Sequence, residues 1–278
     1  MLLPELIDHI IYFTTNSVSD LSLVNKYFND NVKKIRIISN KDYPKMKNEY
    51  LQSLPNLTEL YLPGGYVINY QGIRYLKNLK ILDLTCTRSP DERITDSDLS
   101  KITSLTHLGL SYNRIITDEG ISGLTNLTFL DLAGTTISDR GIMNLNKLEF
   151  IRLSGNTMVT NDGLARLSSL TDLNLYSNDK ITFNESMYRL KKLTLGYNFI
   201  ILDDELSKLT NLEILDLEFN KIITDKGVSN LVNLKDLFVN DLITNEGISN
   251  LTNLRSLALG NNTIISNIDK NIRVTKWG

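Results

Sequence analysis

Hydrophobic residues recur along this chain with one spacing, which covers it from residue 32 almost to the C-terminus. In the clearest copy, Leu215 and Leu217 follow Leu212 at three and five places, and Asn220 follows it at eight. Copies begin at eleven positions, 20 to 26 residues apart: Val32, Leu57, Leu79, Leu105, Leu127, Leu148, Leu170, Leu190, Leu212, Leu234 and Leu254. Because the copies adjoin one another, we expect eleven repeats and no domain boundary within residues 32–278.

The spacing L-x-x-L-x-L-x-x-N resembles the signature of the leucine-rich repeat. The resemblance implies an α/β fold, a horseshoe-shaped solenoid with a parallel concave sheet and short convex helices or 3₁₀ turns. Side chains alternate along a strand, so we expect Leu215 and Leu217 to point into the core and Asp216 to point outward. The residues that flank the inward leucines should therefore form the concave surface.

The second half of the unit repeats variants of the phrase Ile-Thr-Asp-x-Gly-Ile, as in residues 116–121, 137–142 and 223–228. Thr or Ser suits a helix N-cap, and the Asp that follows favours the positive end of a helix. The phrase therefore predicts a short convex helix in most repeats.

An asparagine column is predicted after the strands, because a buried amide can satisfy backbone groups that the end of a strand leaves unpaired. Its members are Asn113, Asn156, Asn178, Asn198, Asn220 and Asn262. Thr87 and Thr135 take this place in two units, and Gly65 and Leu242 take it in two others. We expect less regular turns where the asparagine is replaced.

The first 31 residues differ from the repeats. Apolar residues with the spacing of one helical face predict two short helices, the second beginning near Ser19 or Asp20. The residues of this face are Leu3, Pro4, Leu6, Ile7, Ile10, Ile11, Leu21, Val24 and Phe28. Two such helices cannot close a core alone, so they must pack on the array or on a partner.

This segment resembles an F-box in its Leu-Pro, Leu6-Ile7, Ile10-Ile11, Asp20-Leu21, Leu23-Val24, Lys26 and Phe28. An F-box followed directly by leucine-rich repeats implies a substrate receptor of an SCF-type ubiquitin ligase, in which the apolar face named above docks the adaptor subunit. The alternative is a helical cap over the first repeat of a scaffold unrelated to a ligase. One residue fewer follows Pro4 than in the family pattern, and Asn25 stands where the family often has Cys.

The C-terminal tail, residues 264–278, is expected to close the other end of the array. A terminal repeat needs its open core covered. Residues 272–274 can form a last edge strand, and Trp277 is the candidate to cover the exposed end.

Composition narrows the function. A net charge of −2 argues against binding nucleic acid or an anionic membrane, and no apolar run is long enough to span a bilayer. The single cysteine, Cys86, allows no intrachain disulfide, and no secretory signal opens the chain. We therefore expect an intracellular monomer, cytoplasmic or nuclear.

Catalysis is not expected. Cys86 and His107 are the one thiol–imidazole pair to consider, and aligning their repeats separates them by roughly 16 Å along the sheet. The sequence has no phosphate-binding glycine loop and no Cys/His cluster with zinc spacing. We predict neither a metal nor a cofactor.

A protein target is expected on the concave surface. Phe129 and Phe150 should be neighbours on adjacent strands, exposed beside carboxylates, which suits a hot spot for a basic or hydrophobic segment. The candidate residues are Asp83, Phe129, Asp131, Phe150, Arg152, Asp172, Tyr176, Lys192, Asp216, Glu218 and Phe238. The alternative is that these aspartates belong to the repeat consensus and form a solvated face.

Overall fold

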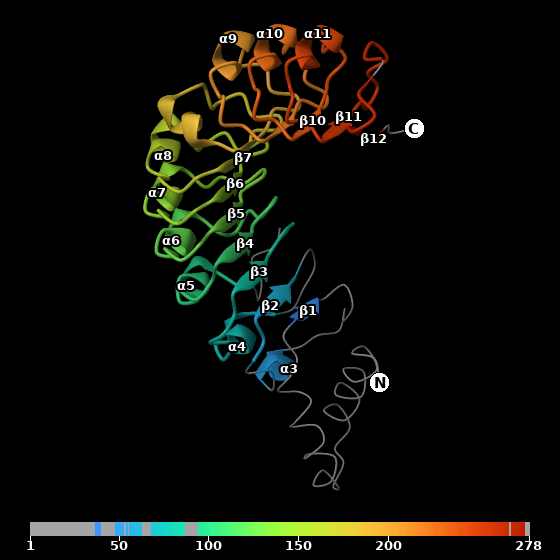
Figure 1. The fold of residues 1–278 in the computed structure, drawn as a ribbon. Helices are drawn as coiled ribbons and strands as arrows, with labels where there is room; N and C mark the ends of the chain where they lie inside the picture. The colour runs from blue at the N-terminus through green and yellow to red at the C-terminus, as the bar shows by residue number, and fades with distance from the viewer. Residues whose placement is uncertain are drawn as a thin grey trace, which may run out of the picture.

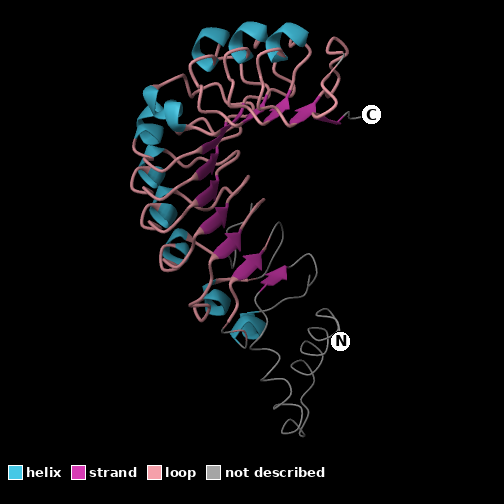
Figure 2. Ribbon diagram, viewed as in Figure 1, coloured by secondary structure: helices cyan, strands magenta, loops and turns pink. Residues whose placement is uncertain are grey.

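A computed structural model describes residues 37–39, 48–52, 54, 56–62, 68–86, 94–266 and 268–275. These residues form a curved solenoid, with the strands on its inner, concave side and short helices on its outer side (Figures 1 and 2). Several predicted features lie outside the described residues: the N-terminal helices, the asparagine-column positions held by Gly65 and Thr87, and Trp277.

One parallel sheet runs the length of the described array. Its twelve strands pair in sequence order, and each has three residues. They are β1 Ile37–Ser39, β2 Glu59–Tyr61, β3 Ile81–Asp83, β4 His107–Gly109, β5 Phe129–Asp131, β6 Phe150–Arg152, β7 Asp172–Asn174, β8 Lys192–Thr194, β9 Ile214–Asp216, β10 Asp236–Phe238, β11 Ser256–Ala258 and β12 Arg273–Thr275. Strands β2 to β11 lie where the repeats that begin at Leu57 to Leu254 place them, and β12 is the predicted last edge strand, one residue later than predicted.

The predicted register of the first repeat was wrong: Ile38, not Ile35, pairs with Leu60, so β1 lies three residues after the place that a start at Val32 predicts. Isoleucines stand at 35, 37 and 38, so the apolar spacing there fits more than one register.

The convex side carries one short helix in most described repeats. They are α3 Asn48–Gln52, α4 Tyr70–Ile73, α5 Asp96–Leu99, α6 Asp118–Ile121, α7 Asp139–Ile142, α8 Asn161–Ala165, the 3₁₀ helix η1 Glu185–Arg189, α9 Asp203–Leu206, α10 Asp225–Val228 and α11 Asn245–Ile248. The predicted N-cap residues lie at the helix starts: Thr117 and Ser138, for example, each accept a hydrogen bond from the backbone N–H two residues later, whereas Thr224 holds the N-cap position of α10 without such a bond. The helical phrase therefore does what its residues predict.

The core is a single cluster of buried Leu, Ile and Val residues, with Met187, that extends from Leu51 to Ile265. The middle residue of each strand from β2 to β11 is buried and belongs to it. Ile268 and Ile272 of the tail pack against this cluster, as expected of a segment that closes the array. Burial on this scale supplies most of the driving force for folding.

The asparagine column is present and is longer than predicted. Asn220 donates from its amide nitrogen to the carbonyls of Leu195 and Asn198, both at 3.0 Å, so it ties its turn to the preceding repeat. The prediction for the β10 repeat was wrong. There Asn240 occupies the column, and its Oδ1 accepts from the backbone N–H groups of Leu242 and Ile243. The turn after β10 is two residues shorter, so a count of eight residues from Leu234 misses Asn240 and arrives at Leu242.

Candidate functional site: the concave surface

The concave surface consists of the first and third residues of the strands. In β2 to β7, β9 and β10 these residues are partly exposed while the middle residue is buried; in β8 and β11 the third residue is buried too. Every predicted target-binding residue within a strand occupies one of these outward positions, because alternation along a strand is a local property. Their positions therefore agree with the sequence prediction, and their binding role stays a prediction.

Three aromatic rings stack across β4, β5 and β6. The rings of Phe129 and Phe150 are parallel within 6°, with centroids 4.2 Å apart. His107 stacks on the other side of Phe129 at 5.6 Å and 19°. The predicted adjacency of the two phenylalanines is confirmed, but they are half-buried rather than fully exposed, because each ring covers its neighbour. His107, which is not among the predicted site residues, completes the stack.

Both cations of the predicted site are paired across adjacent strands. Arg152 Nη1 lies 3.4 Å from Asp131 Oδ2, and its Nε donates to Ser154 Oγ at 3.2 Å. Lys192 Nζ lies 3.4 Å from Asp172 Oδ2. Since the described strands of this surface carry more acids than cations, the charge left after pairing is negative.

The aspartates at the third strand position have a structural role. One carboxylate oxygen of Asp83, Asp131 and Asp216 accepts from the backbone N–H two residues later, at 2.8 to 3.0 Å. Asn174 makes the same bond to the N–H of Tyr176 at 3.0 Å, so a carboxylate is not required for it. The consensus interpretation therefore explains one oxygen of each aspartate; the charge of Asp131 is paired with Arg152, and the charges of Asp83 and Asp216 are left unexplained.

Two of the acids are costly to keep ionised. Burial raises the pKa of Asp172, and Lys192 partly offsets this effect. Asp172 Oδ1 is buried without a hydrogen-bond partner. Burial also raises the pKa of Asp216, against the lowering effects of the Glu218 N–H and Lys192. These carboxylates reduce the stability of the fold at neutral pH, so repeat stability alone does not account for them.

Further aromatic residues lie where the strands end. Tyr176 follows β7, and its ring meets that of Tyr197 edge-on at 5.4 Å and 76°. Tyr197 in turn stacks on Phe219 at 5.2 Å and 13°. Tyr176 and Glu218 are among the predicted site residues, whereas Tyr197 and Phe219 are not. Tyr197 and Phe219 each stand seven residues after the first leucine of their repeats, and this equal spacing is the sequence signal that could have identified them as neighbours. Phe238 lies on β10 beside Asp216.

The predicted adaptor-binding residues cannot be placed. Leu3, Pro4, Leu6, Ile7, Ile10, Ile11, Leu21, Val24 and Phe28 all lie outside the described residues. The expectation that they form an F-box stays a prediction.

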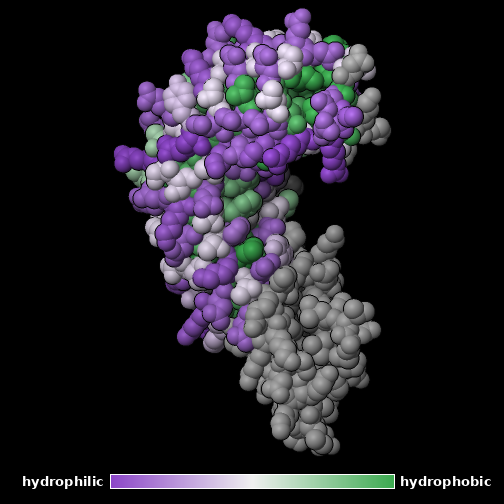
Figure 3. Space-filling view, in the orientation of Figure 1, coloured by the Kyte–Doolittle hydropathy of each residue, from purple (hydrophilic) through white to green (hydrophobic). Residues whose placement is uncertain are grey.

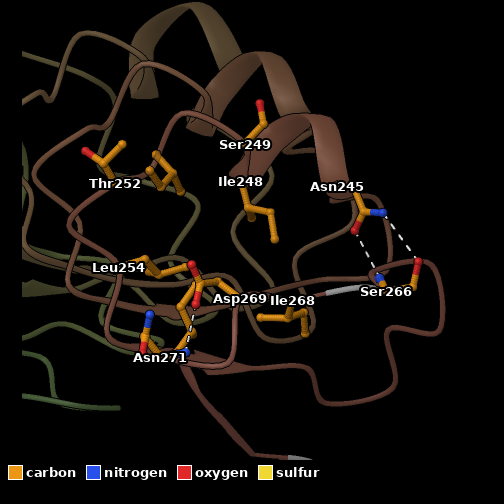
Figure 4. Close-up of a pocket in the computed structure, with 11 residues that line it drawn as sticks. Asn245, Ile248, Ser249, Thr252, Leu254, Ser266, Ile268, Asp269 and Asn271 are labelled. Atoms are coloured by element: carbon orange, nitrogen blue, oxygen red, sulfur yellow. Dashed lines mark hydrogen bonds between the residues drawn. The ribbon is translucent and has the colours of Figure 1, made fainter.

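A groove of about 500 Å³ lies at the C-terminal end of the array, between α11 and the tail (Figure 4). Ile248, Leu254 and Ile268 form its apolar wall, and Asn245 accepts from the N–H of Ser266 at 3.0 Å on one side. Hydrophobic side chains also gather near the last repeats in the space-filling view, whereas most of the visible surface is hydrophilic (Figure 3). The groove lies where the last repeat meets the C-terminal tail, and its lining residues form no group of reactive side chains.

Among the residues that the structure describes, no group of three or more His, Cys, Asp or Glu is placed to hold a metal ion. Cys86 is exposed in its turn after β3. No helix in the described part of the chain is both long and apolar enough to cross a membrane.

A family model described as a leucine-rich repeat matches residues 101–125, 123–145 and 208–232. No curated protein matches the chain at a significant level. Among solved structures, an internalin from Listeria monocytogenes is 23% identical, with a TM-score of 0.56 over 88% of this chain and 88% of that chain. A chain from the yeast complex of Rad7 and Elc1 is 18% identical, with a TM-score of 0.57 over 88% of this chain and 77% of that chain. A leucine-rich-repeat protein from Leptospira interrogans is 22% identical, with a TM-score of 0.57 over 90% and 79%. At these identities the likeness shows the fold.

Proposed function

Because the chain is a leucine-rich-repeat protein, we propose that it is a protein-interaction module whose concave surface holds a protein target. The stack of His107, Phe129 and Phe150 carries this proposal. Aromatic residues near the centre of a polar, partly charged surface are the usual hot spots of protein interfaces. The pair Arg152–Asp131 and the acids that surround it provide the polar rim.

A finer proposal is that the module is an F-box substrate receptor of an SCF-type ubiquitin ligase. Its support is the order of the sequence, with an F-box-like segment in residues 1–31 directly before the repeats. One solved structure with the same fold comes from a complex of two proteins, Rad7 and Elc1. In this role the N-terminal apolar face binds the adaptor subunit, and the ubiquitin-transfer chemistry belongs to the partners. The alternative is a scaffold whose N-terminal helices only cap the array.

Target capture tests the interaction surface. We expect the double change Phe129→Ala and Phe150→Ala to weaken capture of the target by at least about tenfold, because it removes a hot spot worth about 1.4 kcal/mol or more. Affinity capture with mass spectrometry identifies the target, and a binding titration with that target gives the ratio. Phe199→Ala is the matched control, since Phe199 is an aromatic residue 46% exposed outside the concave strands. Unchanged capture by the double variant would remove this surface from consideration.

Co-purification tests the ligase role. We expect the full chain to bind the purified adaptor subunit and a chain without residues 1–31 to lose it. If both forms fail to bind, the F-box interpretation is wrong. The thermal midpoints of the two forms then test the cap, because a scaffold that needs its cap melts at a lower temperature without it.

A further inference from the structure

A second aromatic group lies beyond the carboxyl ends of β7, β8 and β9. We call Tyr176, Tyr197, Phe219 and the adjacent Glu218 the edge cluster. The Tyr197 ring is central: it contacts Tyr176 edge-on and Phe219 face to face. Tyr197 is 38% exposed and Phe219, at the end of the row of rings, is 44% exposed, so a partner can reach both residues.

The backbone under these rings is strained. Tyr197 has φ 50° and Phe219 has φ 62°, in the left-handed region that bulky residues avoid. The corresponding turns after β5 and β6 have glycine there, Gly134 and Gly155, both with φ 62°. Since glycine fits this turn without strain and the rings are exposed, core packing does not explain the aromatic residues. Cys86, Tyr112 and Ser177 also have positive φ, so strain belongs to this kind of turn, and it is the stacking and exposure of the rings that single out Tyr197 and Phe219.

The charge around the cluster is negative. Glu218 belongs to the cluster and Asp216 is two residues before it, and neither takes part in an ion pair among the described residues. The nearest cation of the sheet, Lys192, is held by Asp172. The pKa of Tyr176 is raised first by burial and then by the negative charges of its neighbours, Glu218 and Asp216 among them. A cation is therefore the charge that this surface complements.

We propose that the edge cluster binds an arginine side chain of a protein partner. A guanidinium group is planar, so it can stack on the outer face of the Phe219 ring while its N–H fork donates to the Glu218 carboxylate. Lysine lacks the planar group, so it would make only the charge attraction to Glu218 and not the stacking contact. This inference rests on the proposed role of the concave surface in holding a protein, and it assigns the chemistry that the partner presents.

A small peptide tests the edge cluster directly. The probe is acetyl-Gly-Arg-Gly-amide, titrated into the full chain while the ring signals of tyrosine and phenylalanine are followed by NMR. We expect saturable shifts at Tyr176, Tyr197 and Phe219 with millimolar affinity, since an exposed cation–π contact is weak. The same peptide with citrulline, a neutral isostere of arginine, should give no saturable shift. Glu218→Gln should weaken the affinity of the protein for the arginine peptide by about threefold or more.

Two variants separate binding from folding. Phe219→Gly removes a ring and relieves the left-handed strain, so we expect it to abolish the saturable shift at Tyr197 without lowering the thermal midpoint. Tyr112→Leu is the matched control, because Tyr112 is an exposed aromatic residue in the same kind of turn, with φ 54°, three repeats before that of Tyr176. It should leave the affinity unchanged.

Equal shifts with the citrulline peptide, an equal loss in Tyr112→Leu, or the absence of a saturable shift up to about 20 mM peptide would overturn the proposal. The capture assay with Phe129 and Phe150 uses the target instead, so it can fail while the peptide still binds, and the reverse also holds. Failure of the edge cluster is therefore distinguishable from failure of the proposed function.

Discussion

Asn220 and Asp216 differ in role: the turn uses the whole side-chain amide of Asn220, whereas it uses one oxygen of Asp216 and does not need its charge. Asn220 is buried, and both ends of its amide are used: it donates to the preceding repeat and accepts from the N–H groups of Ile222 and Ile223. Asp216 also anchors a turn, through the N–H of Glu218 at 2.9 Å, but that bond needs only an oxygen acceptor. Asn174 makes the same bond from β7. The charge of Asp216 is therefore free for recognition, and the fold loses stability by keeping it.

This comparison predicts the effect of Asp216→Asn. The folded-state pKa of Asp216 is raised by burial, so its stability penalty is absent below the unfolded pKa and fully present above the folded pKa. We expect Asp216→Asn to raise the thermal midpoint at pH 7 and the gain to shrink as the pH falls toward 3. Thermal melts of both proteins across this range measure it. A lower midpoint for the variant at pH 7 would show that the ionised carboxylate stabilises the fold.

At the scale of elements, the first residue of one helix shapes the next helix. Asp203 of α9 accepts from the backbone N–H of Thr224 at 2.9 Å and from its hydroxyl at 2.6 Å, just before α10. A Cβ on Gly227 would lie 2.5 Å from Asp203 Oδ1, which is too close. The glycine of the helical phrase is thus required by the aspartate of the preceding repeat.

Two of the exceptions follow the same rule, whereas a third, Glu185, takes the glycine place although Asn161 of the preceding repeat accepts from the Thr182 N–H at 3.2 Å. The first helical position is aromatic at Tyr70, and Phe183 holds the corresponding place before η1. In the repeats that follow them, the glycine is replaced by Asp98 and Glu205. Each of these acids accepts from the backbone N–H of its own N-cap residue instead, at 3.0 and 2.9 Å. Where the neighbour offers no acceptor, the helix supplies its own.

A double-mutant cycle tests this coupling between elements. We expect Gly227→Ala to destabilise the protein by about 1–3 kcal/mol, because the new methyl group overlaps the Asp203 carboxylate. In an Asp203→Ala background the same change should cost clearly less, since the overlapping atom is gone. Denaturant unfolding of the four proteins gives the coupling energy. Gly123→Ala is the control, because nothing lies within 4 Å of a Cβ there; additive costs would contradict a direct contact.

Across the whole molecule, stability is shared along one line of repeats. The sheet pairs β1 to β12 in sequence order, so each repeat packs on its neighbours in the chain, and the described core forms one cluster. The stability of such a solenoid comes from the interfaces between neighbouring repeats, and an interior repeat has two of these whereas a terminal repeat has one.

The position of a core leucine should therefore decide the cost of removing it. We expect Leu173→Ala, in β7 and fully buried, to cost about 2–5 kcal/mol and to speed amide exchange in the repeats on both sides. Leu254→Ala, near the C-terminal end and 7% exposed, should cost less and affect only the last repeats. Hydrogen exchange with mass spectrometry measures both effects, and uniform exchange changes in the two variants would contradict nearest-neighbour stabilisation.

The local pattern alone predicted most of the fold and the positions of the candidate site. Which residues face inward, which face the concave side and which start a helix follow from alternation along a strand and from N-cap chemistry, and each of these acts within a few residues. Counting residues failed at Asn240, where the turn is shorter by two. A fixed spacing cannot detect such a deletion, whereas the buried hydrogen bonds of the amide identify it at once.

The sequence by itself determined the repeat, its core leucines and the residues that line the concave surface. Only the tertiary structure decided how neighbouring repeats meet: that Phe129 is covered by His107 and Phe150, that Tyr197 bridges Tyr176 and Phe219, and that Asp203 requires Gly227. The physical reason is distance along the chain. These contacts join residues about twenty places apart, and they exist only once parallel strands are paired in register.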